Sequence, residues 1–484
     1  MAGDNDTALA QQGQAFQLKT PKGTRDWAGR DLLLRDHIFQ TISAVFQRNG
    51  EIPLDTPVFE LRDVLAGKYG EDSRLIYDLD DQGGERCSLR YDLTVPNVKH
   101  IKRYQIAKVY RRDQPAISRG RLREFYQCDF DIAGVYDPMV PDVEALRVIV
   151  EVFRALGMEI TIKLNHRKIL DGVFEAAGVP EDKIRLVSSA VDKLDKIAWA
   201  DVKKEMVDEK GIAGEVADRI GEYVRLSGGI RDTIKVLRSD LGLCANAKVK
   251  AGLDDMDLLV SYLDAMDIVD TVSFDLSLAR GLDYYSGLIY EMIPTTTSAN
   301  QRGKSSQIQV GSIAAGGRYG GLVGMYGKHP IPCVGISFGV DRIFTLLDAR
   351  RNKSPSELTH EVHVYIMSAG GKDGLLLERM AVARQLWDAG IRAEYTAKVK
   401  PKLQQQFNAF TGPLSIILGP DELAAGQVRL KVRAGDKEPR AQVQSKNSGG
   451  KEEVVEKDRG QLVSRDDLVE EVKRQLAALT LEQD

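Results

Sequence analysis

The sequence is poor in the residues that build metal clusters and disulfide frameworks. Only four of its 484 residues are cysteine and six are histidine. The cysteines stand far apart without a CxxC pair and the histidines are not clustered, which argues against a disulfide framework and against a structural zinc site. No apolar run approaches the ~20 residues that a membrane-spanning helix needs. We therefore expect a soluble protein with no membrane partner.

A large excess of charge of either sign is also absent. The 67 basic and 71 acidic residues leave a net charge of -4, so any contact with nucleic acid must come from a local basic surface. Apolar residues make up 43% and charged residues 29% of the chain, which is ordinary for a folded protein. The length suggests about three units at roughly 100–200 residues per domain.

Targeting signals are not evident. Residues 1–17 are polar, contain Asp4 and Asp6, and lack lysine and arginine. This composition argues against a secretory signal and against a basic transit peptide. We expect these residues to form a disordered tail, and we expect the protein to be cytoplasmic.

The common phosphate-binding loops are missing as well. The nearest approach to a Walker A motif, around Gly303 and Lys304, has Ser298 where the first glycine must stand. No GxGxxG motif occurs. A nucleotide would therefore be held by guanidinium groups or by another kind of loop.

The hydrophobic spacing predicts one large unit and one small one. The large unit is expected over 18–350, with these elements in chain order: a helix over 31–48, strands and turns over 54–133, a helix over 138–156, a helical insertion over about 167–253, further strands, and a helix over 340–350. Residues 351–361 are polar and form the predicted linker. Strand and helix alternate over 362–484, which predicts a small α/β domain. The stretch 433–460 lacks a clear period and is expected to be a surface loop.

Arginines cluster in a predicted long-looped hairpin. They are Arg111, Arg112, Arg119, Arg121 and Arg123. Planar guanidinium forks suit phosphate and carboxylate oxygens. On the return strand, period-two alternation places Gln127, Asp129 and Asp131 on one face. That row is either a solvated sheet face or the polar floor of a site.

A second arginine follows an apolar row. Phe274, Leu276 and Leu278 alternate along a predicted strand that continues to Arg280 on the same face. Burying an unpaired charge is costly, so Arg280 has either a structural carboxylate partner or an anionic ligand. Tyr284 and Tyr285 follow in a turn and could serve packing alone.

Two further segments carry weaker signals. Residues 311–327 are rich in glycine, which permits close approach by a flat ligand, although glycine-rich turns more often serve geometry alone. GISFGVDRIF joins a strand to a helix whose start carries Asp341 and Arg342. Taken alone, Arg342 is as well explained by a surface ion pair.

Taken together, these segments resemble the histidyl-tRNA synthetase family of class II aminoacyl-tRNA synthetases. LDTPVFE resembles motif 1, YRRDQPAISRGRLREFYQ motif 2 and GISFGVDRI motif 3, and SLARGLDYY and AAGGRY resemble two peptides peculiar to the histidine enzymes. The likeness runs from about Leu18 to Ala478. It implies an α+β fold with an antiparallel catalytic sheet, a helical insertion, a C-terminal α/β anticodon-binding domain, and a homodimer.

The resemblance also implies roles for individual residues. Arg111 and Arg280 would be catalytic, Arg111 bridging the histidine carboxylate and the α-phosphate. The residues implied in histidine binding are Asp92, Leu93, Thr94, Arg111, Gln127, Asp131, Arg280, Tyr284 and Tyr285, with Asp131 and the tyrosines lining the imidazole pocket. The residues implied in ATP binding are Arg111, Asp113, Arg121 and Arg342.

The implied reaction is ATP-dependent activation of L-histidine followed by transfer to tRNA(His). Mg²⁺ would be held mainly through the ATP phosphates, with no tightly bound cofactor. The loop 114–120 is expected to approach the tRNA acceptor end, and Lys398, Lys400 and Lys402 are either an RNA contact or a solvated face. The alternative function is a synthetase-like regulatory protein that binds histidine or tRNA without ligating them.

Two positions depart from the family pattern. Only Asn97 to His100 separate Pro96 from Ile101, where roughly two more turns of helix are expected. We expect this short connection to affect packing around Asp92 and Thr94. Gly320 stands where the family usually has aspartate.

Overall fold

The computed structural model describes residues 19–69, 74–80, 83–94, 101–281, 284–295, 311–320, 331–351, 362–371, 373–409, 412–432 and 460–481. The expected tail over 1–17, the short connection after Pro96 and almost all of the predicted linker and of the loop 433–460 lie outside these residues. The chain divides into two compact units. The larger comprises the described residues of Met1–Asp26 and Arg35–Leu347, and the smaller those of Trp27–Leu34 and Asp348–Asp484.

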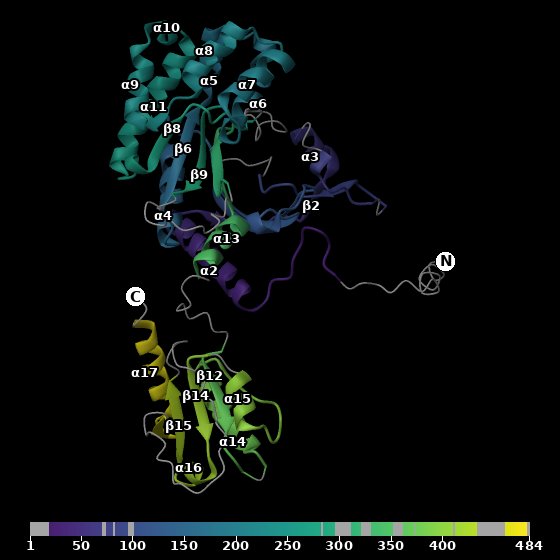
Figure 1. Ribbon diagram of the computed structural model, residues 1–484, viewed down its shortest axis with the longest axis vertical. Helices are drawn as coiled ribbons and strands as arrows, with labels where there is room; N and C mark the ends of the chain where they lie inside the picture. The colour runs from purple at the N-terminus through teal and green to yellow at the C-terminus, as the bar shows by residue number, and fades with distance from the viewer. Residues whose placement is uncertain are drawn as a thin grey trace. The chain divides into compact units, whose positions relative to one another are not determined.

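The larger unit is built on a nine-stranded sheet with the order β1-β4-β5-β11-β10-β9-β6-β8-β7 (Figure 1). Its strands are β1 (Ile52–Pro53), β4 (Ile101–Tyr110), β5 (Glu124–Ala133), β6 (Ile160–His166), β7 (Ser227–Gly229), β8 (Val272–Asp275), β9 (Leu288–Pro294), β10 (Ala314–Arg318) and β11 (Cys333–Gly339). From β4 through β6, every neighbouring pair is antiparallel. A separate ribbon pairs β2 (Phe59–Leu61) with β3 (Cys87–Leu89). The expected antiparallel sheet is confirmed for the six strands from β4 through β6, whereas β1 pairs with β4 and β6 with β8 in parallel.

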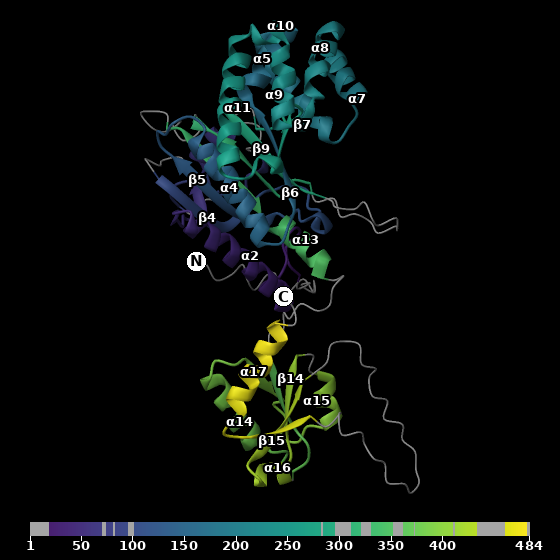
Figure 2. The same cartoon turned by 90° about the vertical axis from the view of Figure 1, so that its left-hand side faces the viewer.

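Helices α2 (Gly29–Arg48) and α4 (Val140–Ala155) cover one face of this sheet (Figure 2). The Phe46 ring of α2 lies 5.5 Å from that of Phe130 on β5 and 5.8 Å from that of Phe338 on β11. Phe153 of α4 packs on the same Phe338 ring at 5.6 Å. Because side chains alternate across a strand, the neighbours of Phe130 on β5 point to the opposite face. That opposite face carries the candidate site.

The insertion is helical from Arg167 onward. It contains α5 (Arg167–Ala177), α6 (Ile184–Val191), α7 (Trp199–Lys204), α8 (Gly214–Val224), α9 (Ile230–Ser239), α10 (Leu241–Cys244) and α11 (Ala247–Ala265). The helical run continues to Ala265, beyond the expected end near 253, because Met256, Leu259 and Leu263 extend the buried stripe of α11. Asn246 caps this helix, accepting bonds from the amides of Lys248 and Val249.

The strand expected to reach Arg280 is shorter than predicted. β8 ends at Asp275, whose carboxylate accepts the Ser277 amide at 3.0 Å and so turns the chain out of the sheet. Arg280 therefore does not lie on the apolar row of this strand. Apolar alternation continued past the strand end, and sequence alone did not reveal the turn.

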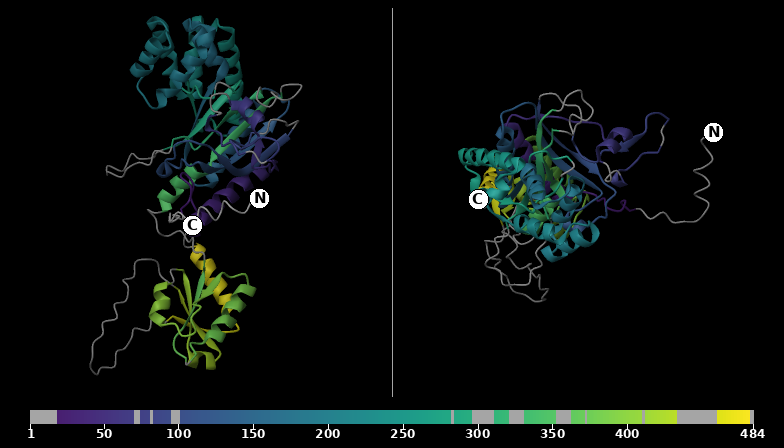
Figure 3. Two further views of the ribbon diagram at one scale, coloured as in Figure 1. Left: turned by 90° about the vertical axis from the view of Figure 1, so that its right-hand side faces the viewer. Right: turned by 90° about the horizontal axis from the view of Figure 1, so that it is seen from above.

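The smaller unit contains a five-stranded mixed sheet with the order β13-β12-β14-β15-β16 (Figure 3). Its elements are β12 (Val364–Ser368), α14 (Leu376–Asp388), β13 (Ala393–Tyr395), α15 (Leu403–Ala409), β14 (Leu414–Leu418), α16 (Pro420–Ala424), β15 (Gln427–Val432), β16 (Gln461–Ser464) and α17 (Leu468–Leu481). Val364 and Ile366 pack with α14 and α17, whereas Tyr365 and Met367 pack with α15. Helices therefore cover both faces, as expected of a small α/β domain.

One helix remains to complete the larger unit. α13 (Val340–Arg351) directly follows β11. Its first residues include Asp341 and Arg342, as the sequence predicted for a strand–helix junction. No helix within the described ranges is long and apolar enough to cross a membrane.

Candidate active site

A buried polar row forms the floor of the site. Gln127, Asp129 and Asp131 of β5 are each more than nine-tenths buried. They alternate with the apolar Cys128 and Phe130, which point to the helix-covered face. The row is therefore not a solvated sheet face. Buried polar groups of this kind need partners or a ligand.

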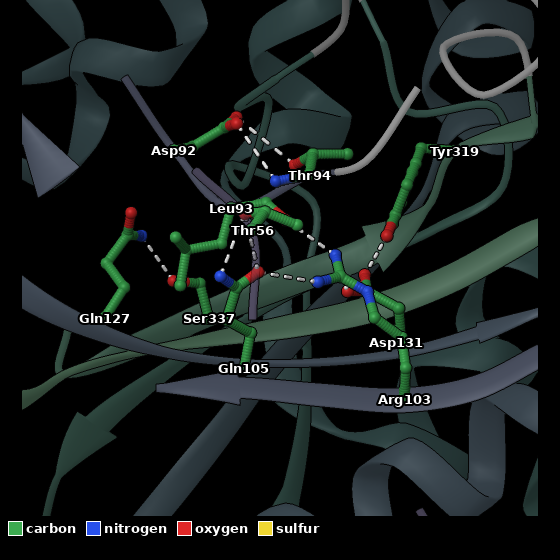
Figure 4. Close-up of polar contacts among 10 residues, drawn as sticks. All are labelled: Thr56, Asp92, Leu93, Thr94, Arg103, Gln105, Gln127, Asp131, Tyr319 and Ser337. Atoms are coloured by element: carbon green, nitrogen blue, oxygen red, sulfur yellow. Dashed lines mark hydrogen bonds and ion pairs between the residues drawn. The ribbon is translucent and has the colours of Figure 1, made fainter. Parts of the chain in front are cut away.

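Asp131 is held by two donors. Arg103 of β4 stands opposite it in the β4–β5 register, and the guanidinium forms an ion pair with the carboxylate at 2.6 Å. The Tyr319 hydroxyl donates a hydrogen bond to the same carboxylate (Figure 4). A Cβ on Gly335 would come within 2.1 Å of the Asp131 carboxylate. The absence of a side chain at Gly335 therefore makes room for this arrangement.

Arg103 was not predicted as a site residue, although it ties the floor to the segment above it. Its Nη2 donates to the Leu93 carbonyl at 2.6 Å, and its Nη1 donates to Gln105 Oε1 at 3.3 Å. Thr94 donates to Asp92 through its amide at 3.0 Å and through its hydroxyl at 3.2 Å. Figure 4 shows this segment beside the floor residues. The signal that could have identified Arg103 is a basic residue in the same alternating row of β4 as Ile101, Ala107 and Val109.

Gln127 and Asp129 each keep one oxygen without a hydrogen-bond partner among the described residues, Oε1 in Gln127 and Oδ1 in Asp129. The Gln127 amide nitrogen donates to the Ser337 hydroxyl on β11. Burial, chiefly, and the neighbouring Asp131 charge raise the pKa of Asp129 to about 7. These oxygens are acceptors that a cationic ligand can satisfy.

The expected tyrosines lie together. The rings of Tyr284 and Tyr285 are 4.5 Å apart and tilted by 57°. Gly281, with φ +66°, precedes them, and a Cβ there would meet the Tyr285 ring at 2.6 Å. Tyr285 also packs against the small cluster of Ala133, Cys333 and Tyr319, of which Tyr319 donates to Asp131. An aromatic wall therefore adjoins the carboxylate of the floor.

Two described glycines of the glycine-rich segment, Gly316 and Gly317, serve close packing. A Cβ on Gly316 would lie 2.1 Å from the Gly335 carbonyl oxygen, and one on Gly317 would lie 2.7 Å from the Tyr285 ring. Both glycines belong to β10, between β9 and β11. Local geometry, and not close approach by a flat ligand, accounts for the glycines at these two positions.

Two of the predicted arginines meet over one hydroxyl. Nη1 of Arg280 and Nη1 of Arg342 each lie 3.4 Å from the Ser312 Oγ. Arg342 also donates to the Ser312 carbonyl. The Arg280 guanidinium is 3.9 Å from Glu291, too far for a tight ion pair, and its side chain is 52% exposed. Of the two alternatives for Arg280, a structural carboxylate partner or an anionic ligand, the structure thus shows only a weak carboxylate pair. The half-exposed guanidinium can still receive an anion.

Other arginines act electrostatically on Arg342. The pKa of Arg342 is lowered, first by burial and then by the positive charges of Arg280, Arg121 and Arg111. Such a shift indicates that each of these guanidinium groups lies near Arg342. The site therefore accumulates positive charge that a polyanionic ligand would neutralise.

Arg111 is oriented by aromatic rings. Its guanidinium lies 4.3 Å from the centre of the Tyr91 ring and 5.2 Å from that of Phe125. Its Nε donates to the Tyr91 carbonyl at 3.1 Å. Among the described residues its terminal nitrogens form no hydrogen bond or ion pair. They remain available to an anion.

The hairpin loop packs against the start of α13. Arg121 forms an ion pair with Asp113, so these two predicted ATP residues hold each other here. Gly120, with φ +65°, sits so close to α13 that a Cβ would lie 2.8 Å from the Asp341 carbonyl oxygen. Arg342 is the next residue along. The hairpin loop and the backbone at Arg342 are therefore in direct contact.

An antiparallel sheet with a buried polar floor and a cluster of arginines, joined to a small mixed α/β unit, is the architecture of a class II aminoacyl-tRNA synthetase. A family model described as histidyl-tRNA synthetase matches residues 23–343, and one described as anticodon binding domain matches residues 363–475. The chain belongs to the histidyl-tRNA synthetase family.

Named relatives match most of its length. A mitochondrial histidine–tRNA ligase of Saccharomyces cerevisiae is 53% identical over 447 residues, covering 86% of this chain and 82% of that protein. A histidine–tRNA ligase of Danio rerio is 50% identical and covers 88% of each chain. The crystal structure of histidyl-tRNA synthetase from Nostoc sp. PCC 7120 superposes with a TM-score of 0.73 at 27% identity, covering 95% of this chain and 100% of that one.

Proposed function

We propose that this chain activates L-histidine with ATP, releases pyrophosphate, and transfers the histidyl group to tRNA(His). The observation that carries this proposal is the meeting of Arg280 and Arg342 over Ser312, in a positive cluster that includes Arg111 and Arg121. Family membership and about 50% identity to named histidine–tRNA ligases support it.

The first step needs no protein nucleophile. The histidine carboxylate attacks the α-phosphorus of ATP, and pyrophosphate leaves. Catalysis then consists of aligning the reactants and stabilising negative charge as it spreads over the phosphate oxygens. Arg111 holds the carboxylate against the α-phosphate, Arg280 stabilises the α-phosphate, and Arg342 binds the γ-phosphate. Fixed guanidinium groups supply all these functions.

The amino-acid pocket is formed by the floor and the aromatic wall. Asp131, oriented by Arg103 and Tyr319, accepts an imidazole N–H, and Tyr284 and Tyr285 line the ring. The α-ammonium group is bound by Asp92, Leu93, Thr94 and Gln127. An apolar competitor would leave these polar groups unpaired, a situation that supports discrimination of ~10⁴–10⁵ in comparable sites.

ATP enters with Mg²⁺ as part of the substrate. The phosphates would provide most of the ligands of this ion, as is usual for Mg²⁺ bound with a nucleotide. Within the described ranges no group of three or more His, Cys, Asp or Glu residues has the arrangement of a metal site. Glu291, which faces Arg280, is a carboxylate that can add one ligand. When ATP binds, Asp113 and Arg121 exchange their mutual ion pair for contacts with the nucleotide.

We further propose a homodimer. Ile52, Phe59 and Leu61, from the motif 1 region, have exposed fractions of 59%, 57% and 43%. Neighbouring exposed apolar side chains of this size are typical of a protein–protein interface. A second copy of the chain is the proposed occupant of this surface.

The contacts with tRNA are proposed at both units. The loop 114–120 would approach the acceptor end, and the exposed lysines Lys398, Lys400 and Lys402 would contact the anticodon stem-loop. The proposed domains are a tail over 1–17, a catalytic domain over 18–350 with an insertion over about 167–253, a linker over 351–361, and an anticodon-binding domain over 362–484.

The proposed compartment is the cytoplasm. Among the matching relatives, one from Takifugu rubripes is named cytoplasmic and one from Saccharomyces cerevisiae mitochondrial. A fluorescent fusion of the natural gene product tests the proposal, which fails if the signal co-localises with a mitochondrial marker.

Histidine-dependent exchange of pyrophosphate into ATP tests the function. The purified chain should catalyse this exchange, and Arg280→Ala should reduce the rate by at least about 100-fold, as loss of a charge-stabilising group does elsewhere. The matched control is Arg86→Ala, because Arg86 is 68% exposed and 3.5 Å from Asp63. Histidine binding without exchange would instead favour the regulatory alternative.

A further inference from the structure

Two unsatisfied oxygens belong to residues on the same face of the floor of the site. Gln127 and Asp129 occupy alternate positions of β5, on the same face, about 7 Å apart along the strand. Gln127 Oε1 and Asp129 Oδ1 are both buried and have no hydrogen-bond partner among the described residues. Asp131, the next residue of the row, already receives Arg103 and Tyr319. The unmet acceptors are therefore at the Gln127–Asp129 end.

Ser337 fixes which way the Gln127 amide faces. It stands directly opposite Asp129 in the β5–β11 register, and its hydroxyl stabilises the charged form of Asp129 through a hydrogen bond. A hydroxyl has one proton to donate. Because that proton goes to the carboxylate, the Ser337 oxygen must accept from Gln127, and the Gln127 nitrogen does point to it. The Gln127 oxygen is left facing the site.

An acceptor pair of this kind fits a primary ammonium group. Such a group carries only N–H donors, and its positive charge compensates a buried carboxylate. The surroundings favour a cation: Asp92 also raises the pKa of Asp129, and Arg103, which lowers it, is already engaged by Asp131. A carboxylate or phosphate would be repelled here. The anion-binding arginines meet instead at Ser312.

We infer that Asp129 is a specificity residue for the α-ammonium group of the amino-acid substrate. It acts in two ways, through its own Oδ1 and through Ser337, which holds the Gln127 oxygen toward the same ligand. This inference rests on the proposed function, since it assigns part of the histidine pocket. It adds Asp129 and Ser337 to the residues proposed to bind histidine.

The test compares three ligands that share the imidazole ring and differ in whether they carry the ammonium group and the carboxylate. L-histidine has the ammonium and the carboxylate, histidinol keeps the ammonium, and imidazolepropionate keeps the carboxylate. Binding of each is measured by calorimetry on the full chain. With Asp129→Asn, affinity for histidine and histidinol should fall by about 10- to 100-fold, as expected for loss of a charge-assisted hydrogen bond. Affinity for imidazolepropionate should stay within about twofold.

Ser337→Ala provides the second variant, and keeps the inference testable if Asp129→Asn does not fold. Because the Gln127 amide is then free to turn, this variant should lower the affinity for histidine and histidinol, by a smaller factor than Asp129→Asn. The affinity for imidazolepropionate should again be unchanged. In pyrophosphate exchange both variants should raise KM for histidine and leave kcat nearly unchanged. The matched control is Asp254→Asn, whose side chain is 58% exposed and paired with Arg238 on the insertion.

The outcomes separate this inference from the function it rests on. Equal loss of affinity for all three ligands would show that Asp129 only maintains the fold of the pocket, and would overturn the inference while leaving histidine activation intact. Unchanged histidine affinity in both variants would also overturn it. Failure of the unmodified chain to bind histidine or to exchange pyrophosphate would overturn both.

Discussion

Each unit buries an arginine almost completely, and the two guanidinium groups are satisfied in different ways. Arg103 in the larger unit pairs with the Asp131 carboxylate and donates to the Leu93 carbonyl. Among the described residues, Arg379 on α14 of the smaller unit donates only to backbone carbonyls, those of Gly374, Thr396, Lys398 and Val399. Burial lowers the pKa of Arg379.

The difference follows from what each arginine organises. A carboxylate partner neutralises charge and also leaves an oriented acceptor for a ligand, as Asp131 does. A set of carbonyls contributes no charge but fixes the backbone that carries them. The loop that Arg379 holds bears the exposed Lys398 and Lys400. Gly374 completes the contact, since a Cβ there would lie 2.0 Å from the Val399 oxygen.

The largest effect is expected from Arg103→Met. The substitution leaves Asp131 buried without its charge partner, which typically costs about 3–5 kcal/mol of unfolding free energy. Urea unfolding of the chain should show the loss, together with loss of histidine binding. Arg48→Ala is the control, because Arg48 is 64% exposed in its pair with Glu151. A cost below that of the control would mean that the Arg103 pair adds nothing.

Arg379→Met should cost less, about 2–3 kcal/mol, because it strands no charge and water can reach some of the freed carbonyls. Pyrophosphate exchange should be unaffected, whereas affinity for tRNA(His) should fall severalfold as the lysine loop loses its shape. Filter binding at fixed salt measures the second effect. An unchanged tRNA affinity, with the unit less stable, would separate loop shape from RNA binding.

Glu51 extends the comparison to a buried acid without a guanidinium partner. Neither of its oxygens has a hydrogen-bond partner among the described residues, and burial, with Glu144 nearby, raises its pKa to about 7. A raised carboxyl pKa means that the folded state binds the proton more tightly, so stability is greatest below the unfolded pKa and falls as pH rises through about 7. Glu51→Gln should remove this loss. The gain in unfolding free energy of the variant over the unmodified chain should therefore be about 1–3 kcal/mol larger at pH 8 than at pH 5.

The smallest effect on stability is expected at Arg121. Its pair with Asp113 has the same chemistry as the Arg103 pair, but the Arg121 side chain is 53% exposed. Arg121→Ala should therefore change the unfolding free energy by less than about 1 kcal/mol. It should raise KM for ATP and leave KM for histidine unchanged in the exchange assay. A stability loss equal to that of Arg103→Met would contradict the role given to burial.

The fold was accessible from the sequence where one signal dominated. The apolar stripe of α2, with Leu34, Ile38 and Ile42 buried, was predicted because helical spacing and burial agree. The shared face of the polar row of β5 was predicted from period two, but its burial was left open. The end of β8 was not, since apolar alternation carried on beyond Asp275 while a side-chain hydrogen bond turned the chain.

The residues of the site could be predicted from the sequence only where the pattern of a single strand identifies them. Arg103 and Ser337 belong to β4 and β11, and they reach Asp131 and Asp129 through strand register. Register is set by the whole sheet, so no local pattern reveals these pairs. Arg379 escaped notice similarly, because an arginine on a helix is ordinarily a solvated residue.

The contact at Gly120 links two parts of the nucleotide site that sequence places more than two hundred residues apart. No other amino acid fits there without displacing the carbonyl of Asp341. Because the loop at Gly120 packs directly on the first turn of α13, displacing the loop would disturb the backbone that carries Arg342. We therefore expect that an RNA end approaching this loop and a phosphate held by Arg342 would influence one another through that contact.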